Sequence, residues 1–273
     1  MKSEKILVTG AAGYIGGTFT YEVLKKGFEV HGIDNFMNSN INNIKTFLAD
    51  FPKTFYFSEI DLAKDESKLK LVLNEFDPDF IVHFAGLKSV GESEEKPDLY
   101  MKNNVGSTRN LLENMNPKSF FIFSSSATVY GNNPNQPLTE DSQIQATSVY
   151  GLSKIECENL ITDYALNKGV KSICLRYFNP VGSHQEFIVV EDYLNQPNNL
   201  MPKLIECVKN GKNTINVYGN DYETKDGTGE RDYIHIIDLV EGHIAAMEKV
   251  QKIENIDFFN LGTGQSTSVI ELI

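Results

Sequence analysis

Short apolar runs alternate along the chain with longer segments whose apolar residues recur every three or four positions. The runs are typical of strands buried on both faces, and they cover residues 6–8, 28–33, 54–57, 80–84, 119–123 and 172–177. The periodic segments predict helices over residues 14–24, 44–48, 64–76, 97–115 and 148–167. This alternation predicts an α/β fold, a doubly wound, Rossmann-like parallel sheet.

The pattern changes after residue 177. The remainder predicts a loop (178–200), a helix (201–210), a strand (215–218) and a polar loop (219–230). These are followed by a strand (233–235), a helix (236–250) and a strand (257–260). We expect a smaller substrate lobe at the carboxyl edge of the sheet. The predicted domains are therefore 1–177, which binds the cofactor, and 178–273, which binds the substrate. Because residues 266–273 resemble a helix N-cap and first turn, we expect more protein to follow and this lobe to be incomplete.

Charge and composition restrict the function classes. The chain has 25 Lys and Arg against 37 Asp and Glu, a formal net charge of −12. Such a surface repels phosphate backbones and anionic membranes, so we expect neither nucleic acid nor a membrane as partner. An anionic substrate then needs a local cationic pocket. Three scattered cysteines, Cys157, Cys174 and Cys207, suggest reduced thiols in the cytoplasm, and no metal-ligand spacing is visible.

A glycine-rich loop follows the first predicted strand and opens the first predicted helix. Gly10, Gly13 and Gly16 permit a tight turn, close approach of a pyrophosphate and close packing of helix on strand. The helix N-terminus then faces the phosphates. Asp34 closes the second strand, where it can accept hydrogen bonds from ribose hydroxyls and would repel a 2′-phosphate. The loop therefore predicts a dinucleotide site that favours NAD over NADP.

A second constellation is the pair Tyr150 and Lys154, which share one face of the predicted helix. An ordinary tyrosine pKa is near 10, so a base near neutrality requires about 4 kcal/mol of stabilisation of the phenolate. One ammonium about 5 Å away supplies about 3 kcal/mol at an effective dielectric constant near 20. An oxidised nicotinamide adds a second positive charge. The pair is therefore a candidate proton-transfer site next to NAD.

These features, with Ser126, resemble the extended short-chain dehydrogenase/reductase superfamily. The chain is more closely similar to its UDP-glucose 4-epimerase branch, from residue 5 to the last residue. The blocks that carry this similarity are residues 84–93, 123–131, 175–182, 198–202, 226–229 and 231–235. The branch has a further C-terminal segment with an arginine and an aspartate on the UDP group, and this chain ends before it.

The resemblance implies a reaction and a cofactor site. Tyr150 is then the base for the sugar 4-hydroxyl, Lys154 lowers its pKa and holds the nicotinamide ribose, and Ser126 bonds the reacting oxygen. The expected product is the 4-epimer of a UDP-hexose, formed through a transient 4-keto sugar. The NAD contacts implied are Gly10, Gly13, Tyr14, Ile15, Gly16, Asp34, Asn35, Asn38, Ser39, Asp61, Leu62, Phe84, Ala85, Gly86, Lys88, Asn103, Ser124, Tyr150, Lys154 and Tyr177.

The resemblance also implies a UDP-sugar site and a homodimer. Arg231 is the expected cation for the diphosphate, and the full set of substrate contacts is Lys88, Ser126, Tyr150, Phe178, Asn179, Asn199, Leu200, Tyr218 and Arg231. The dimer would form through the helices at 97–115 and 148–167. Two alternatives stay open: a nucleotide-sugar dehydratase or decarboxylase on the same scaffold, and an inactive NAD-binding fragment. A dehydratase carries an Asp-Glu pair that is absent beside Thr128.

Overall fold

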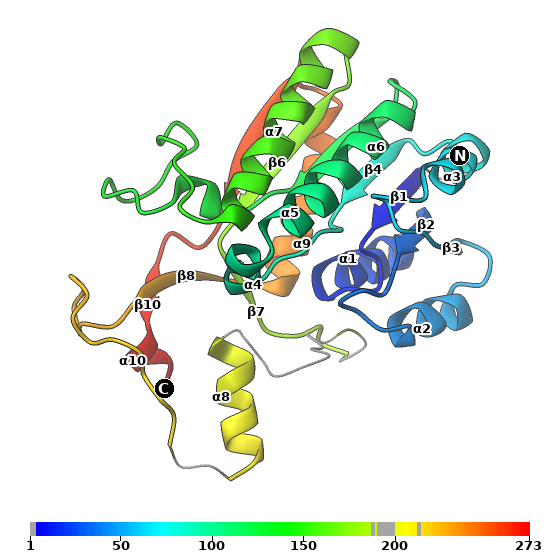
Figure 1. Ribbon diagram of the computed structural model, residues 1–273. Helices are drawn as coiled ribbons and strands as arrows, with labels where there is room; N and C mark the ends of the chain where they lie inside the picture. Colours follow the sequence, from blue (N-terminus) through cyan, green and yellow to red (C-terminus); the bar gives the residue numbers. More distant parts are fainter. Residues whose placement is uncertain (1–3, 187–188, 190–199, 212–213) are drawn as a thin grey trace.

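The computed structural model describes residues 4–186, 189, 200–211 and 214–273. A seven-stranded parallel sheet forms its centre, in the order β3-β2-β1-β4-β5-β6-β9 (Figure 1). The strands are β1 (Lys5–Thr9), β2 (Glu29–Asp34), β3 (Phe55–Glu59), β4 (Phe80–His83), β5 (Phe120–Ser124), β6 (Ser172–Tyr177) and β9 (Ile256–Leu261). The chain reverses its winding direction between β1 and β4, and ligands of such sheets bind beyond the strand ends at that point.

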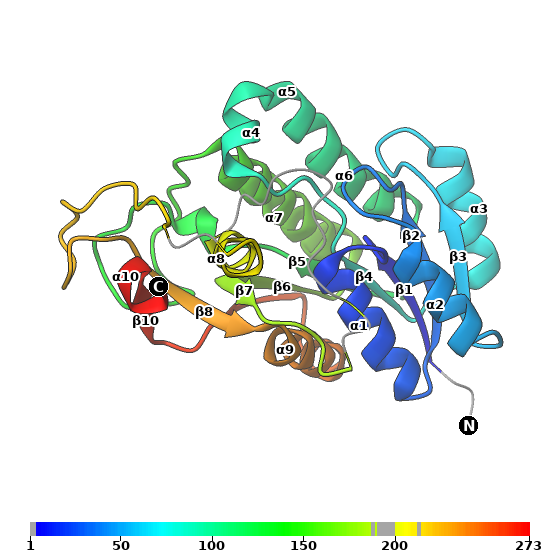
Figure 2. The same cartoon turned by 90° about the horizontal axis from the view of Figure 1, so that it is seen from below.

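Helices cover both faces of this sheet (Figure 2). One face carries α1 (Tyr14–Lys25), α2 (Asn42–Asp50) and α9 (Ile236–Val250), and the other carries α3 (Glu66–Phe76), α6 (Gly106–Asn114) and α7 (Val149–Lys168). Successive strand residues point to opposite faces. Thus Ile6 and Val8 pack with the first set of helices, whereas Leu7 packs with the second. Burial on both faces explains the continuous apolar runs and confirms the predicted doubly wound fold.

The predicted helix over residues 97–115 is interrupted by a change in helix type. It consists of α5 (Pro97–Tyr100), a π-helical turn (Met101–Val105) and α6, and the unpredicted α4 (Val90–Glu95) precedes it. A π turn inserts an extra residue into the helix and often marks a functional site. Here the turn carries Asn103, whose side chain lies at the pocket described below.

A second, three-stranded sheet has the order β10-β8-β7. It contains β7 (Asn179–Val181), β8 (Glu230–His235) and β10 (Ser266–Ser268), with α8 (Leu200–Lys209) and α10 (Val269–Leu272) in the same part of the chain. Figure 1 shows these elements gathered beside the main sheet. They correspond to the predicted smaller lobe.

Three predictions for this region are wrong. The predicted strand 257–260 does not belong to the smaller lobe, because β9 pairs with β6 and α9 packs on the main sheet. Residues 215–218 form no strand, and β7 forms inside the predicted loop 178–200. The chain therefore crosses to the smaller sheet and returns, so residues 178–273 contribute to both sheets. The division into domains 1–177 and 178–273 stays a prediction.

Candidate active site

The glycine-rich loop joins β1 to α1 with a conformation that other residues would strain. Gly10 has φ +71°, in the left-handed region that favours glycine. A Cβ on Gly16 would overlap the Gly10 carbonyl oxygen, because α1 begins directly against the strand end. The N-terminus of α1, with its partial positive charge, therefore lies at the end of β1, which suits a pyrophosphate.

Asp34, at the end of β2, holds this loop in place. Its carboxylate accepts hydrogen bonds from the Ala12 N–H at 3.0 Å, the Phe36 N–H at 2.9 Å and the Ser39 hydroxyl at 2.9 Å. The sequence predicted only contacts from Asp34 to a ribose. The structure adds a second role, because the carboxylate ties the end of β2 to the glycine loop. Asp34 still lies at the wall of the adjoining pocket.

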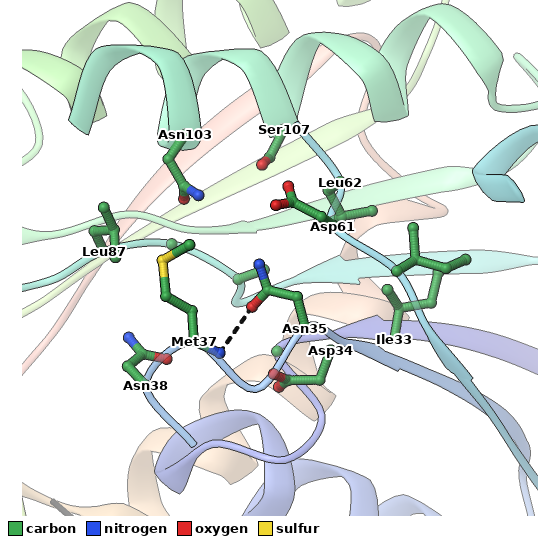
Figure 3. A pocket seen from close by; sticks show the side chains of 14 residues that line it. Ile33, Asp34, Asn35, Met37, Asn38, Asp61, Leu62, Leu87, Asn103 and Ser107 are labelled. Atoms are coloured by element: carbon green, nitrogen blue, oxygen red, sulfur yellow. Dashed lines mark hydrogen bonds between the residues drawn. The ribbon is translucent and has the colours of Figure 1, made fainter. Parts of the chain in front are cut away.

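A pocket with Asp61 on its wall lies beyond the ends of β1 to β4 (Figure 3). We call it the Asp61 pocket. Figure 3 shows the apolar side chains of Met37 and Leu62 interspersed with polar side chains such as Asn35, Asp61 and Asn103. Its lining residues are Gly10, Ile33, Asp34, Asn35, Met37, Asn38, Ile60, Asp61, Leu62, Ala85, Gly86, Leu87, Asn103 and Ser107. This mixture suits an adenine base and its ribose.

A second pocket adjoins the first and contains Tyr150. We call it the Tyr150 pocket. The two share Gly10, Asp34, Asn38 and 85–87. Its lining residues are Gly10, Ala12, Gly13, Tyr14, Ile15, Gly16, Asp34, Asn38, Ser39, Asn40, Asn42, Asn43, Phe84, Ala85, Gly86, Leu87, Lys88, Ser124, Tyr150, Lys154 and Tyr177. Together the pockets follow the strand ends from β3 to β6, as an extended dinucleotide requires.

Helix α7 brings Tyr150 and Lys154 to this second pocket. The helix begins after Ser148, whose hydroxyl accepts the Gly151 N–H at 3.1 Å. Tyr150 therefore stands in the first turn and Lys154 in the next, and both side chains are buried. The Lys154 ammonium donates to the Ser124 carbonyl oxygen at 2.8 Å and lies 5.8 Å from the centroid of the Tyr150 ring.

Ser126 is oriented to donate a hydrogen bond to Tyr150. Its hydroxyl oxygen accepts the Thr128 N–H at 3.2 Å and the Thr128 hydroxyl at 3.0 Å. A serine hydroxyl has one proton and two acceptor positions. With both acceptor positions used by Thr128, the remaining proton is available to the Tyr150 phenol, whose pKa Ser126 lowers.

Burial dominates the ionisation of the phenol. It raises the pKa of Tyr150 to about 12, although the hydrogen bond from Ser126 lowers it. The neighbouring Tyr177, whose hydroxyl accepts the Ser124 hydroxyl at 3.0 Å, also has its pKa raised to about 12 by burial. The lowering of the Tyr150 pKa that was expected from Lys154 is not found; the Lys154 ammonium lies 5.8 Å from the ring centroid and donates to the Ser124 carbonyl oxygen. A base near neutrality therefore requires a further positive charge beside the ring.

All twenty residues predicted to contact NAD lie at these two pockets. The residue types fit the cofactor: a glycine cradle for the pyrophosphate, an acid near the ribose and a mixed apolar pocket for the base. The sequence missed Ala12, Ile33, Met37, Asn40, Asn42, Asn43, Ile60, Leu87 and Ser107. Proximity to the glycine loop and to the strand ends was the available signal for these residues.

Most residues predicted to contact only the substrate lie elsewhere. Phe178, Asn179, Leu200, Tyr218 and Arg231 line neither pocket. The Asn179 amide donates to the Asp232 carbonyl oxygen at 2.9 Å, and the exposed Arg231 guanidinium donates to the Glu230 carbonyl oxygen at 2.8 Å. Asn199 lies outside the described residues. The structure therefore places the predicted cofactor residues at the two pockets, whereas Phe178, Asn179, Leu200, Tyr218 and Arg231 lie outside them.

The fold and these pockets define a dinucleotide-binding protein with a Tyr-Lys pair at the cofactor site. The family model for the NAD dependent epimerase/dehydratase family matches residues 6–262. The chain belongs to this family.

Similar proteins share most of their length with this chain. A UDP-glucose 4-epimerase 2 of Arabidopsis thaliana is 42% identical over 278 residues, covering 99% of this chain and 79% of the relative. The crystal structure of a UDP-glucose 4-epimerase from Bifidobacterium longum in complex with NAD+ and UDP has a TM-score of 0.90 and 39% identity, covering 98% and 81%. The structure of a UDP-Glc/GlcNAc 4-epimerase from Campylobacter jejuni has a TM-score of 0.84 and 33% identity, and the match covers 99% of this chain and 82% of that one.

The described part of the chain holds neither a membrane span nor a metal cluster. None of its helices has the length and apolar character needed to cross a membrane. The same part holds no group of three or more His, Cys, Asp or Glu side chains suited to a metal ion.

Proposed function

We propose that this protein interconverts UDP-galactose and UDP-glucose, with NAD bound throughout the cycle. One observation carries the proposal: Tyr150 and Lys154 line the same pocket as the glycine loop. The relatives named as UDP-glucose 4-epimerases support the choice of sugar.

Each catalytic side chain then has a distinct task. Tyr150 takes the proton of the sugar 4-hydroxyl, and the Ser126 hydroxyl lowers the pKa of this phenol. Lys154 contributes positive charge and holds the cofactor ribose. The glycine loop and the other residues of the two pockets would hold NAD, which would supply a reversible hydride acceptor for carbon 4 and so allow the return of the hydride to the opposite face of the 4-keto sugar. Phe178, Asn179, Asn199, Leu200, Tyr218 and Arg231 hold the UDP group, which prevents loss of the intermediate.

An assay with added UDP-galactose and no external reductant tests the proposal. Conversion to UDP-glucose, detected by anion-exchange chromatography, is the expected result. Release of a 4-keto-6-deoxy sugar would instead indicate a dehydratase, and carbon dioxide from UDP-glucuronate a decarboxylase. Bound NAD without turnover of any UDP-sugar would indicate an NAD-binding protein. UDP-N-acetylgalactosamine is tested alongside, because the Campylobacter jejuni relative is described as a UDP-Glc/GlcNAc 4-epimerase.

We also propose a homodimer formed through α5, α6 and α7. Apolar side chains are exposed there: Leu99 is 38%, Leu152 48% and Leu166 62% exposed. Exposed apolar groups on neighbouring helices favour association. Light scattering after gel filtration should give twice the mass of the chain, and Leu152→Glu should reduce it to the monomer.

The cytoplasm is the proposed location. Cys157, Cys174 and Cys207 are free cysteines, as in proteins of reducing compartments. Fractionation of source cells should recover the protein with cytoplasmic markers, and recovery with secreted or membrane fractions would contradict the proposal.

A further inference from the structure

One face of α7 lies against three consecutive serines at the end of β5. Tyr150, Lys154 and Glu158 are spaced four residues apart, so they share this face. The serines are 124–126, of which 124 ends β5 and the next two follow it. Tyr150 is paired with the third serine, which lowers the pKa of the phenol, Lys154 donates to the carbonyl oxygen of the first, and Glu158 accepts a hydrogen bond from the hydroxyl of the second. The first two contacts belong to the candidate active site, whereas the mechanism does not use the third.

The third contact involves a buried ion pair. The Ser125 hydroxyl donates to Glu158 Oε1 at 2.6 Å. Arg176 on β6 donates to the same carboxylate through Nε at 3.0 Å and through Nη2 at 2.8 Å. The Arg176 and Glu158 side chains are only 3% and 4% exposed. A two-point pair of this kind fixes distance and angle together.

Arg176 is itself held from several sides. Its guanidinium lies 4.5 Å from the centroid of the Phe258 ring on β9 and donates to the Tyr130 hydroxyl at 3.1 Å. Tyr130, in the 3₁₀ turn 127–130 that follows Ser126, donates to Asn260 Oδ1 on β9 at 2.7 Å. The pair therefore connects α7 with the elements on both sides of the catalytic serine.

We propose that Ser125, Glu158 and Arg176 form a positioning unit that holds the Ser126 hydroxyl against Tyr150. The inference rests on the proposed function. None of the three lines either pocket, so they are positioning residues. A buried ion pair gains little stability over well-packed apolar side chains, which makes its geometry the more informative property. The hydrogen bond from Ser125 to Glu158 fixes the position of Ser125, and the position of Ser126, the next residue in the chain, depends on it.

Ser125→Ala is the most selective test, because it removes one hydroxyl and leaves the ion pair intact. Ser172→Ala is the matched control. Ser172 is also fully buried, but its hydroxyl donates to the Val170 carbonyl oxygen at 3.1 Å, at the opposite end of β6. Both variants are compared with the wild type as NAD-loaded protein, with cofactor content measured in each.

The expected result for Ser125→Ala is a fall in kcat of about tenfold, because small misplacements of reacting groups are costly. KM for UDP-galactose and the NAD content should match the control. The rising limb of the kcat–pH profile should also move to higher pH, since Ser126 would then stabilise the phenolate less. Equal kcat in the two variants, or an unshifted pH profile, would overturn the inference.

A crystal structure of NAD-loaded Ser125→Ala separates this inference from the proposed function. We expect the Ser126 and Tyr150 oxygens to lie farther apart in this variant than in Ser172→Ala. An unchanged contact would overturn the inference whatever the enzyme does. If the wild type fails to convert UDP-galactose, the proposed function fails, and the crystal structures still decide whether Ser125 positions Ser126.

Discussion

Replacing Ser126 by alanine removes the hydrogen bond that lowers the pKa of the Tyr150 phenol. A hydrogen bond to a charged group contributes about 1.5–3 kcal/mol. At about 1.4 kcal/mol per unit, its loss raises the pKa of Tyr150 by about 1–2 units. A base acts in its deprotonated form, so kcat near neutral pH should fall about 10- to 100-fold.

The direction of the shift in the kcat–pH profile follows from the raised pKa of Tyr150. A raised pKa leaves less phenolate at low pH, so the rising limb should move to higher pH and activity should recover as the pH increases. The assay is the initial rate of UDP-glucose formation at saturating UDP-galactose, from about pH 6 to pH 10.

Ser119→Ala is the control for Ser126→Ala. The Ser119 hydroxyl is buried and donates to the Pro78 carbonyl oxygen at 2.6 Å, at the other end of β5. A Ser126→Ala variant whose rising limb coincides with those of this control and the wild type would refute the reasoning.

Three other substitutions test the fold around the site. Gly16→Ala places a Cβ against the Gly10 carbonyl oxygen, so it should lower the free energy of unfolding by about 3 kcal/mol and release NAD. Arg176→Met leaves the Glu158 carboxylate buried and unpaired, which should cost about 3–5 kcal/mol in urea denaturation. Burial lowers the pKa of His83 to about 3 in the folded protein. As the pH falls, His83 is therefore protonated in the unfolded chain at a higher pH than in the folded one, which destabilises the fold. Between pH 7 and pH 5, the free energy of unfolding should therefore decrease by about 2 kcal/mol less in His83→Gln than in the wild type.

Each substitution has a matched comparison. Gly91→Ala adds a Cβ with nothing within 4 Å, and the Gly16 argument fails if both alanine variants unfold alike. Combining Arg176→Met with Glu158→Leu should recover most of the loss, and a double variant no more stable than the single would contradict the pairing argument. An unchanged pH slope for His83→Gln would contradict its low pKa.

Local patterns predicted the main sheet because its strands are buried on both faces. Residues such as Ile6, Leu7 and Val8 form a continuous apolar run for that reason, and the glycine loop stands directly after it. Local patterns do not predict which strands pair with each other. β9 resembles any short apolar strand in sequence, and its place beside β6 follows from packing with residues far away in the chain.

The candidate site divides in the same way. Tyr150 and Lys154 were predictable because their spacing puts them on one helix face. Glu158 and Arg176 are 18 residues apart on different elements, so no local spacing links them. The raised pKa of Tyr150 was not predictable either, because burial depends on the whole fold.

The central claim is that the Tyr150 phenol is the base for the sugar 4-hydroxyl, and Tyr150→Phe tests it most directly. The measurement is kcat for UDP-galactose with the purified variant, alongside its NAD content. The account predicts a fall of about 10²- to 10⁴-fold, the usual contribution of a general base, while NAD stays bound. Turnover close to that of the wild type would contradict it.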